Sequence, residues 1–283
     1  MNVFEAIDYS RRELSQNQFD ANIRVGLEAE LLLAFVLKQR REWLHTWWDN
    51  EIQESSFDEL SDCIARRLMG EPLEYIIGKT SFYGEEFYVD KRVLIPRTET
   101  EILVEKVLSL ITDKRIKYVG EIGIGSGVIS IMLALLCPSI LINATDISMQ
   151  AIEVAKINIS RFATHSNNLK KRIKLISTDL FEGVDEIPEL LISNPPYIAN
   201  NYPLSKNVLF EPSEALFGGI CGDEVIKRVI DFAKSKRISF LACEIGYDQK
   251  KSLEAYLSKN TYEAFFYQDL NGLDRGFVAQ FRN

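Results

Sequence analysis

From residue 118 onward, the chain alternates short apolar segments with longer amphipathic ones. The apolar segments are rich in β-branched residues and carry few charges, as strands that are buried on both faces do. Alternation of such strands with helices predicts a parallel sheet that helices cover on both faces. The last two apolar segments have no helical segment between them, so we expect an antiparallel hairpin at the sheet edge. The predicted strands are residues 118–122, 140–145, 173–177, 189–193, 238–244, 262–268 and 276–281.

The chain before this sheet has a different pattern. Residues 1–75 carry apolar positions at helical spacing and no convincing strand, which predicts a small helical domain. Residues 76–95 hold aromatic and β-branched runs that glycines interrupt, and this indicates a β-hairpin connector. The sequence therefore predicts three regions, a helical domain, a connector and an α/β domain over residues 96–283.

Two helix starts have the pattern of a capping box. Ser56 is followed by Glu59, and Thr98 is followed by Glu101, each pair three residues apart. In such a box the first side chain caps the helix, and the acidic one bonds back to it. Gly70 is expected to end the helix that Ser56 opens.

The charge balance narrows the choice of partners. The 283 residues have a net charge of −8, and the basic runs are short. Stable, sequence-independent binding to duplex nucleic acid needs a sizeable cationic face, so we expect no stable nucleic-acid binding.

Cysteine and histidine usage limits redox and metal chemistry. The four cysteines are far apart with no Cys-x-x-Cys pair, and His45 and His165 are the only histidines. We expect reduced thiols and no metal site. The start of the chain lacks a charged and apolar leader, and no apolar run is long enough to span a bilayer. We therefore expect a cytoplasmic protein without membrane attachment.

A glycine-rich loop follows the first predicted strand of the sheet and leads into a helical segment. Glycines there let a ligand approach the backbone at a helix N-terminus, although a plain tight turn uses them too. Asp146 ends the second strand, where a carboxylate can accept hydrogen bonds from both ribose hydroxyls. Together they indicate a nucleoside cofactor. The candidate cofactor-binding residues are Glu121, Gly123, Ile124, Gly125, Ser126, Gly127 and Asp146.

Two further strands end in polar residues. Asp179 follows the third strand, where it can accept an adenine amino hydrogen while Leu180 packs on the ring; a surface aspartate is the alternative. Asn194 follows the fourth strand. Four consecutive strands thus carry polar groups at their carboxyl ends, the edge where open α/β sheets bind ligands.

Asn194 opens the loop Asn194-Pro195-Pro196-Tyr197. Neither proline donates a backbone hydrogen bond, and each restricts its neighbours, so the loop is stiff. Backbone carbonyls and the Asn194 side chain become fixed acceptors beside the aromatic face of Tyr197. A lone Asn-Pro pair is usually an ordinary strand-ending turn, but the full string predicts a receptor for a planar NH2 group.

The two ligand sites together favour S-adenosylmethionine. A nicotinamide dinucleotide would also satisfy the glycines and Asp146, but it does not explain a rigid NH2 receptor, whereas S-adenosylmethionine supplies an electrophilic methyl group. If Asn194 Oδ1 and the Pro195 carbonyl accept both amide hydrogens, the nitrogen lone pair is directed at that methyl group by orientation, without a strong base. A water-poor pocket favours the reaction further. The candidate catalytic residues are Asn194, Pro195 and Tyr197; Pro196 completes the substrate-binding loop, and Asn194 is expected to contact the cofactor too.

Nearly the whole chain resembles the HemK/PrmC family of protein glutamine methyltransferases. Besides the loop Asn194-Pro195-Pro196-Tyr197, the resemblance rests on residues 28–33, 70–78, 95–101, 211–216, 218–219 and 244–246. It implies a Rossmann-like class I S-adenosylmethionine-dependent methyltransferase fold, with a seven-stranded, mostly parallel sheet and an all-α N-terminal domain that engages the substrate. It also implies methylation of the side-chain amide nitrogen (N5) of the glutamine in the Gly-Gly-Gln motif of class I peptide chain release factors, with S-adenosyl-L-homocysteine as product.

By that resemblance, Gly123 to Gly127 and Asp146 hold the cofactor, Asp179 and Leu180 its adenine, and Asn194 to Tyr197 the substrate glutamine. Glu121 stands where many members have aspartate, and Thr98 where proline is common. The resemblance gives no derived role for Arg97, Thr100 or Glu211.

Other activities fit the same loop. A methyltransferase for a glutamine in a ribosomal protein would share the active site and differ in the helical domain. An adenine amino-methyltransferase acting on DNA or RNA would bind an equally planar amine, but the acidic charge disfavours it. A cofactor-sensing module that binds release factor without turnover would not need the intact loop.

Overall fold

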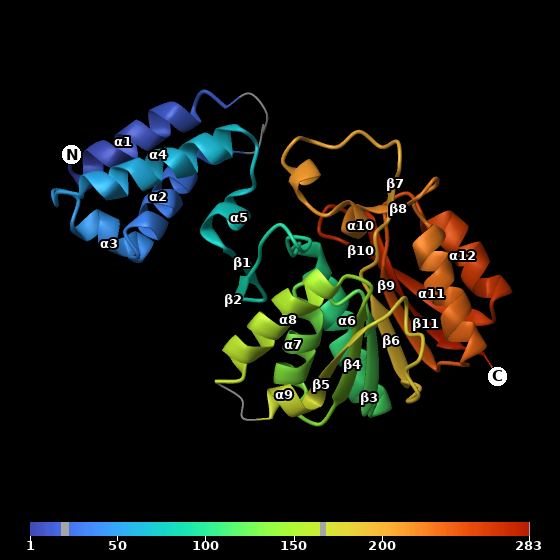
Figure 1. Cartoon of the computed structure of the whole chain (residues 1–283). Coiled ribbons are helices and arrows are strands. Elements are labelled where there is room, and N and C mark those ends of the chain that lie inside the picture. The colour runs from blue at the N-terminus through green and yellow to red at the C-terminus, as the bar shows by residue number, and fades with distance from the viewer. Residues whose placement is uncertain (18–22, 165–167, 283) are drawn as a thin grey trace. The chain divides into compact units, whose positions relative to one another are not determined.

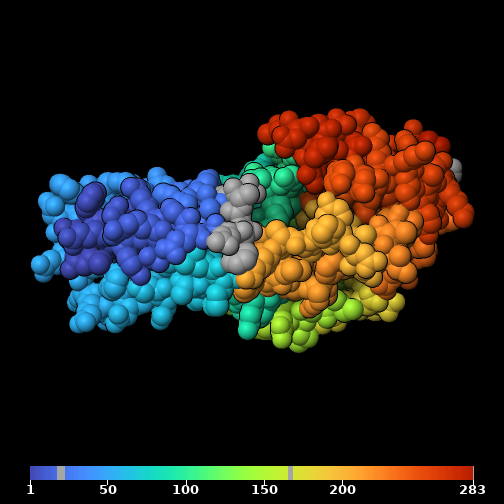
Figure 2. All heavy atoms as spheres, turned by 90° about the horizontal axis from the view of Figure 1, so that it is seen from above, coloured from blue at the N-terminus to red at the C-terminus, as the bar shows by residue number. Residues whose placement is uncertain are grey.

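The computed structural model describes residues 1–17, 23–164 and 168–282. These residues form two compact units, one of Met1–Lys79 with Pro203–Glu211 and one of Thr80–Tyr202 with Pro212–Asn283. The helices of Met1–Lys79 are blue to cyan in the ribbon (Figure 1), and their residues have the same colours in the space-filling view (Figure 2). This division by compactness falls inside the predicted connector, and the boundaries of residues 1–75, 76–95 and 96–283 stay a prediction.

The first unit is helical, as predicted. The apolar faces of its helices enclose a core that includes Val3, Leu14, Leu32 and Leu60, all fully buried. Burial of such side chains is the main source of stability in a small bundle. The helices are α1 (Val3–Leu14), α2 (Val25–Val36), α3 (Arg41–Thr46), α4 (Glu54–Leu68) and α5 (Leu73–Ile77), with a 3-10 turn at Val208–Phe210.

Neither predicted capping box forms. Helix α4 begins at Glu54, so Ser56 lies inside its first turn rather than at its cap. Thr98 does precede α6 (Glu99–Lys114), but its side chain caps nothing. Glu101 instead accepts a hydrogen bond of 2.7 Å from the backbone N–H of Tyr83, so a tertiary contact takes the place of the local one. The predicted stop at Gly70, with a φ of 103°, is confirmed.

The predicted hairpin is present. Strands β1 (Lys79–Phe82) and β2 (Glu85–Tyr88) form a two-stranded sheet. Tyr83 and Gly84 join them with positive φ values of 55° and 79°, which suit the right-handed twist of a hairpin. Residues 76–77, expected in this connector, instead complete helix α5.

The second unit contains a seven-stranded sheet in the order β10-β11-β9-β6-β3-β4-β5. The five strands from β9 to β5 in this order are parallel, and β11 is antiparallel to both of its neighbours. The predicted fold class and the hairpin at the edge are therefore confirmed. The strands are β3 (Tyr118–Ile122), β4 (Leu141–Asp146), β5 (Ile173–Ser177), β6 (Leu190–Ser193), β9 (Phe240–Glu244), β10 (Tyr262–Gln268) and β11 (Asp274–Phe281).

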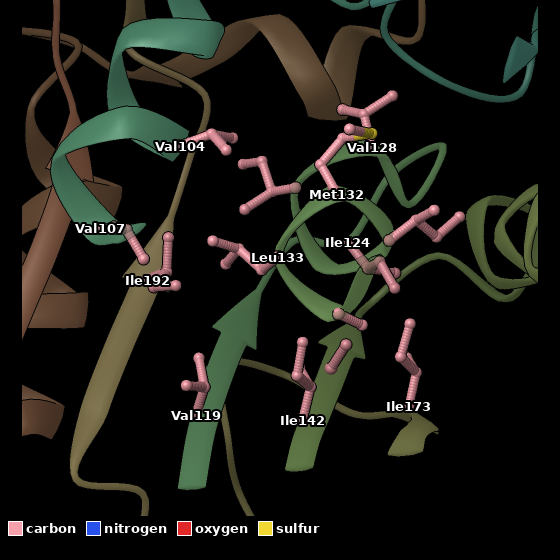
Figure 3. Packing of buried hydrophobic residues seen from close by; sticks show 14 of the residues in the cluster. Val104, Val107, Val119, Ile124, Val128, Met132, Leu133, Ile142, Ile173 and Ile192 are labelled. Atoms are coloured by element: carbon pink, nitrogen blue, oxygen red, sulfur yellow. The ribbon is translucent and has the colours of Figure 1, made fainter. Parts of the chain in front are cut away.

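Helices cover both faces of this sheet (Figure 1). On one face, side chains of α6 and α7 such as Val104 and Leu133 meet Val119, Ile142 and Ile192 of the strands (Figure 3). On the other face, α11 and α12 pack against alternate strand residues. The remaining elements are α7 (Val128–Leu136), α8 (Met149–Phe162), α9 (Leu169–Arg172), α10 (Ser213–Leu216), α11 (Glu224–Ser235), α12 (Lys250–Lys259) and the short parallel pair β7 (Ile198–Ala199) and β8 (Phe217–Gly219).

The strand register aligns the carboxyl ends of four strands. Ile122 at the end of β3 lies opposite Thr145 of β4 and Ser193 of β6, and Asp146 lies opposite Ser177 of β5. The loops that follow these strands therefore leave the sheet at one common edge.

Asn158 of α8 ties the hairpin to the loop after β3. This residue is fully buried. Its Oδ1 accepts a hydrogen bond of 2.8 Å from the Tyr88 N–H, and its Nδ2 donates to the carbonyl oxygens of Tyr88 and Ser126 at 2.9 and 2.8 Å. One side chain thus fixes the edge of β2 and the glycine-rich loop together.

We expect an Asn158→Ala variant to lower the free energy of unfolding by about 3 kcal/mol, because three backbone groups lose their hydrogen-bond partner. Denaturant unfolding followed by circular dichroism measures this change. The matched control is Asn271→Ala, whose side chain is exposed and whose effect should stay within roughly 0.5 kcal/mol. Equal stabilities of the two variants would contradict this assignment.

Candidate active site

A cavity of about 350 Å³ lies in the second unit, at the carboxyl ends of β3, β4, β5 and β6. Its lining also includes residues of α6, α7, α8, α10 and α11 and of the segment before α6. Two predicted site residues, Gly127 and Tyr197, are described but do not line this cavity. The predicted residues that do are Glu121, Gly123, Ile124, Gly125, Ser126, Asp146, Asp179, Leu180, Asn194, Pro195 and Pro196.

The glycine-rich loop leaves open space beside its backbone. The Gly123 N–H donates to the Thr145 carbonyl at 2.8 Å, which holds the loop against β4. Gly125 has a φ of 54°, and no heavy atom lies within 4 Å of the position that its Cβ would take. Gly127 is closely packed, because its Cβ would lie 3.2 Å from Ile131 Cδ1, and its predicted cofactor contact stays a prediction. The loop therefore offers a cradle at Gly125 and close packing at Gly127.

Asp146 holds this loop from the next strand. Its Oδ2 accepts a hydrogen bond of 3.0 Å from the Gly125 N–H, and its Oδ1 accepts one of 2.9 Å from the Ser148 N–H. Burial raises the pKa of Asp146 above its ordinary value, against the opposing effect of these backbone bonds. A carboxylate has about four acceptor positions, so both oxygens keep capacity for a ligand hydroxyl.

Glu121 lies below the loop and is almost completely buried. The Ser130 hydroxyl of α7 donates a hydrogen bond to its Oε2. Burial raises the pKa of Glu121 to about 8, although the Ser130 bond opposes the shift. The Glu121 side chain, which is longer than that of an aspartate, therefore bonds to the helix that follows the loop. The sequence did not predict this contact.

A Glu121→Gln variant should lose less stability than the wild type as the pH rises. Native Glu121 keeps its proton up to about pH 8, whereas an unfolded glutamate titrates near 4.5. Between these values unfolding releases a proton, so the free energy of unfolding of the wild type falls with increasing pH. Melting temperatures from about pH 5 to 9 test this. The exposed Glu254→Gln is the control, and equal slopes for Glu121→Gln and the wild type would refute the expectation.

Asp179 has a partner that the sequence did not reveal. Arg228 of α11 donates to Asp179 Oδ2 at 2.6 Å, and both side chains are partly exposed. Leu180 adopts a left-handed φ of 49°, and its carbonyl oxygen accepts a hydrogen bond from the Thr145 hydroxyl. Because a carboxylate accepts on both oxygens, the ion pair leaves capacity for the predicted adenine amino group.

Asn194 presents an unpaired acceptor. Its Nδ2 donates to the Thr100 hydroxyl oxygen at 3.1 Å. Its Oδ1 is buried and has no hydrogen-bond partner among the described residues. A buried polar atom without a partner costs about 1–3 kcal/mol, so such atoms are rare unless a ligand or water completes them. This oxygen is therefore a candidate acceptor for a donor group of a ligand.

The loop Asn194-Pro195-Pro196-Tyr197, called the proline loop below, is held by close backbone packing. A Cβ on Gly218 would clash with the carbonyl oxygens of Pro196 and Gly222, and one on Gly222 would clash with the Tyr197 carbonyl. Glycine is therefore required where the chain around β8 meets this loop. The Gln249 side chain also donates to the Tyr197 carbonyl at 2.9 Å. Fold contacts thus add to the stiffness that the prolines give.

Glu244, at the end of β9, connects two parts of the site. Its Oε2 accepts a hydrogen bond of 2.7 Å from the Thr100 hydroxyl, and its Oε1 accepts one of 3.2 Å from the Tyr197 hydroxyl. Burial raises the pKa of Glu244 to about 7, and the two hydroxyl donors oppose the shift. Sequence reasoning gave Thr100 and Glu244 no role, although Glu244 closes a predicted strand at the same sheet edge. With its hydroxyl on Glu244, Tyr197 contacts the interior, and its predicted stacking role stays a prediction.

The described residues contain no group of three or more His, Cys, Asp or Glu side chains placed to hold a metal ion. His165 lies outside the described residues. Within the same ranges, no helix is long and apolar enough to cross a membrane.

The cavity fits a nucleoside cofactor next to an NH2-bearing substrate. The cradle at Gly125 and the acceptors of Asp146 lie at the ends of β3 and β4. The unpaired Asn194 Oδ1 lies at the end of β6, which neighbours β3 in the sheet. A donor group on the substrate would therefore meet a fixed acceptor beside the cofactor cradle.

Comparison with known proteins identifies related chains. A family model described as PrmC N-terminal domain matches residues 5–78, and one described as Methyltransferase small domain matches residues 98–213. The chain is 33% identical to the release factor glutamine methyltransferase of Coxiella burnetii, over 97% of this chain and 99% of that protein. It is 40% identical to the protein of the same description from Dictyoglomus turgidum, over 76% of each chain.

Two further matches differ in extent. The chain is 32% identical to the bifunctional methyltransferase of Rickettsia prowazekii, but it spans only 57% of that longer protein. Among solved structures, the hMettl16 catalytic domain in complex with the MAT2A 3′UTR hairpin 6 superposes with a TM-score of 0.55 at 16% identity, covering 99% of this chain and 93% of that one. At this identity the likeness concerns the fold alone.

Proposed function

Because the chain belongs to the release factor glutamine methyltransferase family, we propose that it methylates the side-chain amide nitrogen (N5) of the glutamine in the Gly-Gly-Gln motif of class I peptide chain release factors. S-adenosylmethionine is the methyl donor and S-adenosyl-L-homocysteine the product. This activity belongs to translation termination, so the protein works in the cytoplasm with release factors as partners.

The buried, unpaired Asn194 Oδ1 is the observation that carries this proposal. A glutamine side chain ends in an NH2 group with two hydrogens to donate. One goes to Asn194 Oδ1 and the other to the Pro195 carbonyl, which the proline loop holds in place. A buried acceptor that lacks a partner in the free protein gains its hydrogen bond when substrate binds.

The site promotes the reaction mainly by orienting the substrate amide nitrogen toward the methyl group. An amide nitrogen is a weak nucleophile because its lone pair is delocalised into the carbonyl. With both hydrogens held by Asn194 and Pro195, the remaining lobe of the nitrogen faces the cofactor, and positioning of this kind contributes several kcal/mol to a reaction. As the bond from nitrogen to the methyl group forms and the bond from sulfur to it breaks, the nitrogen becomes acidic and releases one of its two hydrogens to water, so no strong base is needed. The bound cofactor supplies an electrophilic methyl group, and the surrounding apolar lining excludes water.

Separate strand ends hold the parts of the cofactor. Gly123 and Gly125 let it approach the backbone, and Asp146 accepts hydrogen bonds from the ribose hydroxyls. Asp179 accepts the adenine amino hydrogen while Leu180 packs on the ring. These assignments agree with the lining of the cavity and with the general placement of nucleotides at the carboxyl edge of α/β sheets.

A transfer assay with several acceptors tests the proposal. The protein is incubated with methyl-labelled S-adenosylmethionine and, separately, a class I release factor, its Gly-Gly-Gln glutamine-to-alanine variant, ribosomal proteins, and DNA or RNA. Label in the intact release factor but not in its variant is the expected result. Label in a ribosomal protein or in a nucleic acid alone would replace this substrate with one of the other two.

A further inference from the structure

We propose that Thr100 and Glu244 are positioning residues which hold the Asn194 amide with Oδ1, rather than Nδ2, toward the substrate glutamine. The inference rests on the proposed function of Asn194. It assigns a role to two side chains, one at the start of α6 and one at the end of β9, that belong to distant parts of the sequence.

With Glu244 ionised, the hydrogen bonds permit one arrangement. When Glu244 is ionised, above its raised pKa of about 7, it can only accept, so the single hydrogen of the Thr100 hydroxyl goes to Glu244 Oε2 at 2.7 Å. The Thr100 oxygen is then left with acceptor positions alone. Asn194 must therefore turn its NH2 group toward Thr100, at 3.1 Å, and its Oδ1 away. Asn194 thus donates to Thr100, and Thr100 in turn donates to Glu244.

Burial of Thr100 and Glu244 stabilises this arrangement of hydrogen bonds. Thr100 is 2% exposed and Glu244 is 1% exposed, so both side chains have little access to water. The Tyr197 hydroxyl occupies the second oxygen of Glu244 at 3.2 Å. Tyr197 belongs to the same proline loop as Asn194, so Glu244 holds the Tyr197 side chain at the end of the loop and, through Thr100, the Asn194 side chain at its start.

The orientation of the Asn194 amide matters because one end, Oδ1, accepts hydrogen bonds and the other end, Nδ2, donates them. With Oδ1 outward it accepts a hydrogen from a glutamine NH2 group. Rotated by half a turn, it would present its own NH2 group, and two donors would face each other. The flipped form suits a glutamate carboxylate instead, because a carboxylate only accepts. The Thr100 contact therefore lets the site distinguish glutamine from glutamate.

Thr100→Val tests this role, because valine has nearly the same shape and no hydroxyl. We expect its kcat for release factor methylation to fall on the order of 100-fold, as for a misplaced reacting group, while its KM for S-adenosylmethionine stays near that of the wild type. Thr100→Ser keeps the hydroxyl and should retain a rate within a few-fold of the wild type. Thr100→Ala, which also lacks the hydroxyl but leaves more room, should behave like the valine variant and serves if valine prevents folding.

A binding measurement separates positioning from general damage. The affinities of wild type and Thr100→Val are compared for the release factor with glutamine and for its glutamine-to-glutamate variant. The wild type should prefer glutamine, and the valine variant should lose most of that preference. Wild-type rate and preference in both Thr100→Val and Thr100→Ala would overturn the positioning role alone. Absence of methylation by the wild-type protein would overturn the proposed function, and this inference with it.

Discussion

Replacement of Asn194 by alanine is expected to reduce methyl transfer by about 100- to 1,000-fold, the usual loss when one preorganised polar group is removed from a reacting centre. The variant keeps the proline backbone, so the Pro195 carbonyl can still accept one amide hydrogen. The second hydrogen has no acceptor, and the glutamine amide is free to rotate away from the reactive direction. The loss should appear in kcat, since the side chain acts on orientation.

Single-turnover methylation of release factor measures this rate, and calorimetric titration with S-adenosyl-L-homocysteine measures cofactor affinity. The affinity should change little. Asn201→Ala removes an exposed asparagine a few residues further along and should leave both quantities unchanged. Wild-type turnover in the Asn194→Ala variant would contradict the proposed role of this side chain.

The Asp146→Ala variant should be impaired in cofactor binding rather than in methyl transfer. The substitution removes the acceptor for the Gly125 and Ser148 N–H groups as well as the predicted ribose contacts. We expect cofactor affinity to fall roughly 100-fold, or about 3 kcal/mol, which is the value of one or two charge-assisted hydrogen bonds. At saturating cofactor, much of the rate should return.

Calorimetry with S-adenosyl-L-homocysteine measures the affinity directly, and the exposed Asp185→Ala is the matched control. Unchanged affinity in Asp146→Ala would rule out the predicted ribose contact. The pair of variants is informative together, because excess cofactor should restore Asp146→Ala and should not restore Asn194→Ala.

Several features of the fold were readable from local sequence. The strand predictions at residues 118–122, 173–177 and 262–268 match β3, β5 and β10 in full. Strand and helix follow from the spacing of apolar residues, which is a property of neighbouring positions. The parallel order then placed the ends of four strands at one edge, and this was enough to predict that Asp146, Asp179 and Asn194 line one cavity.

Local patterns failed where a distant partner competed. The pair Thr98 and Glu101 has the spacing of a capping box, but Glu101 bonds to the hairpin instead. Gly127 lies close to Ile131 and Ala155, a packing contact that its sequence pattern did not indicate, and its predicted cofactor contact stays a prediction. For the capping box, the local preference is worth about 1 kcal/mol, which tertiary contacts readily exceed.

The sequence by itself determined the alternation of strands and helices, the glycine-rich loop, and the rigid proline loop at the end of its strand. Only the tertiary structure decided which side chains meet there. Asn194 and Thr100 are 94 residues apart, and Thr100 and Glu244 are 144 apart. Hydrogen bonds form between groups within about 3 Å of each other, and the packing of α6 against the sheet, rather than any local pattern, brings these three side chains to that distance.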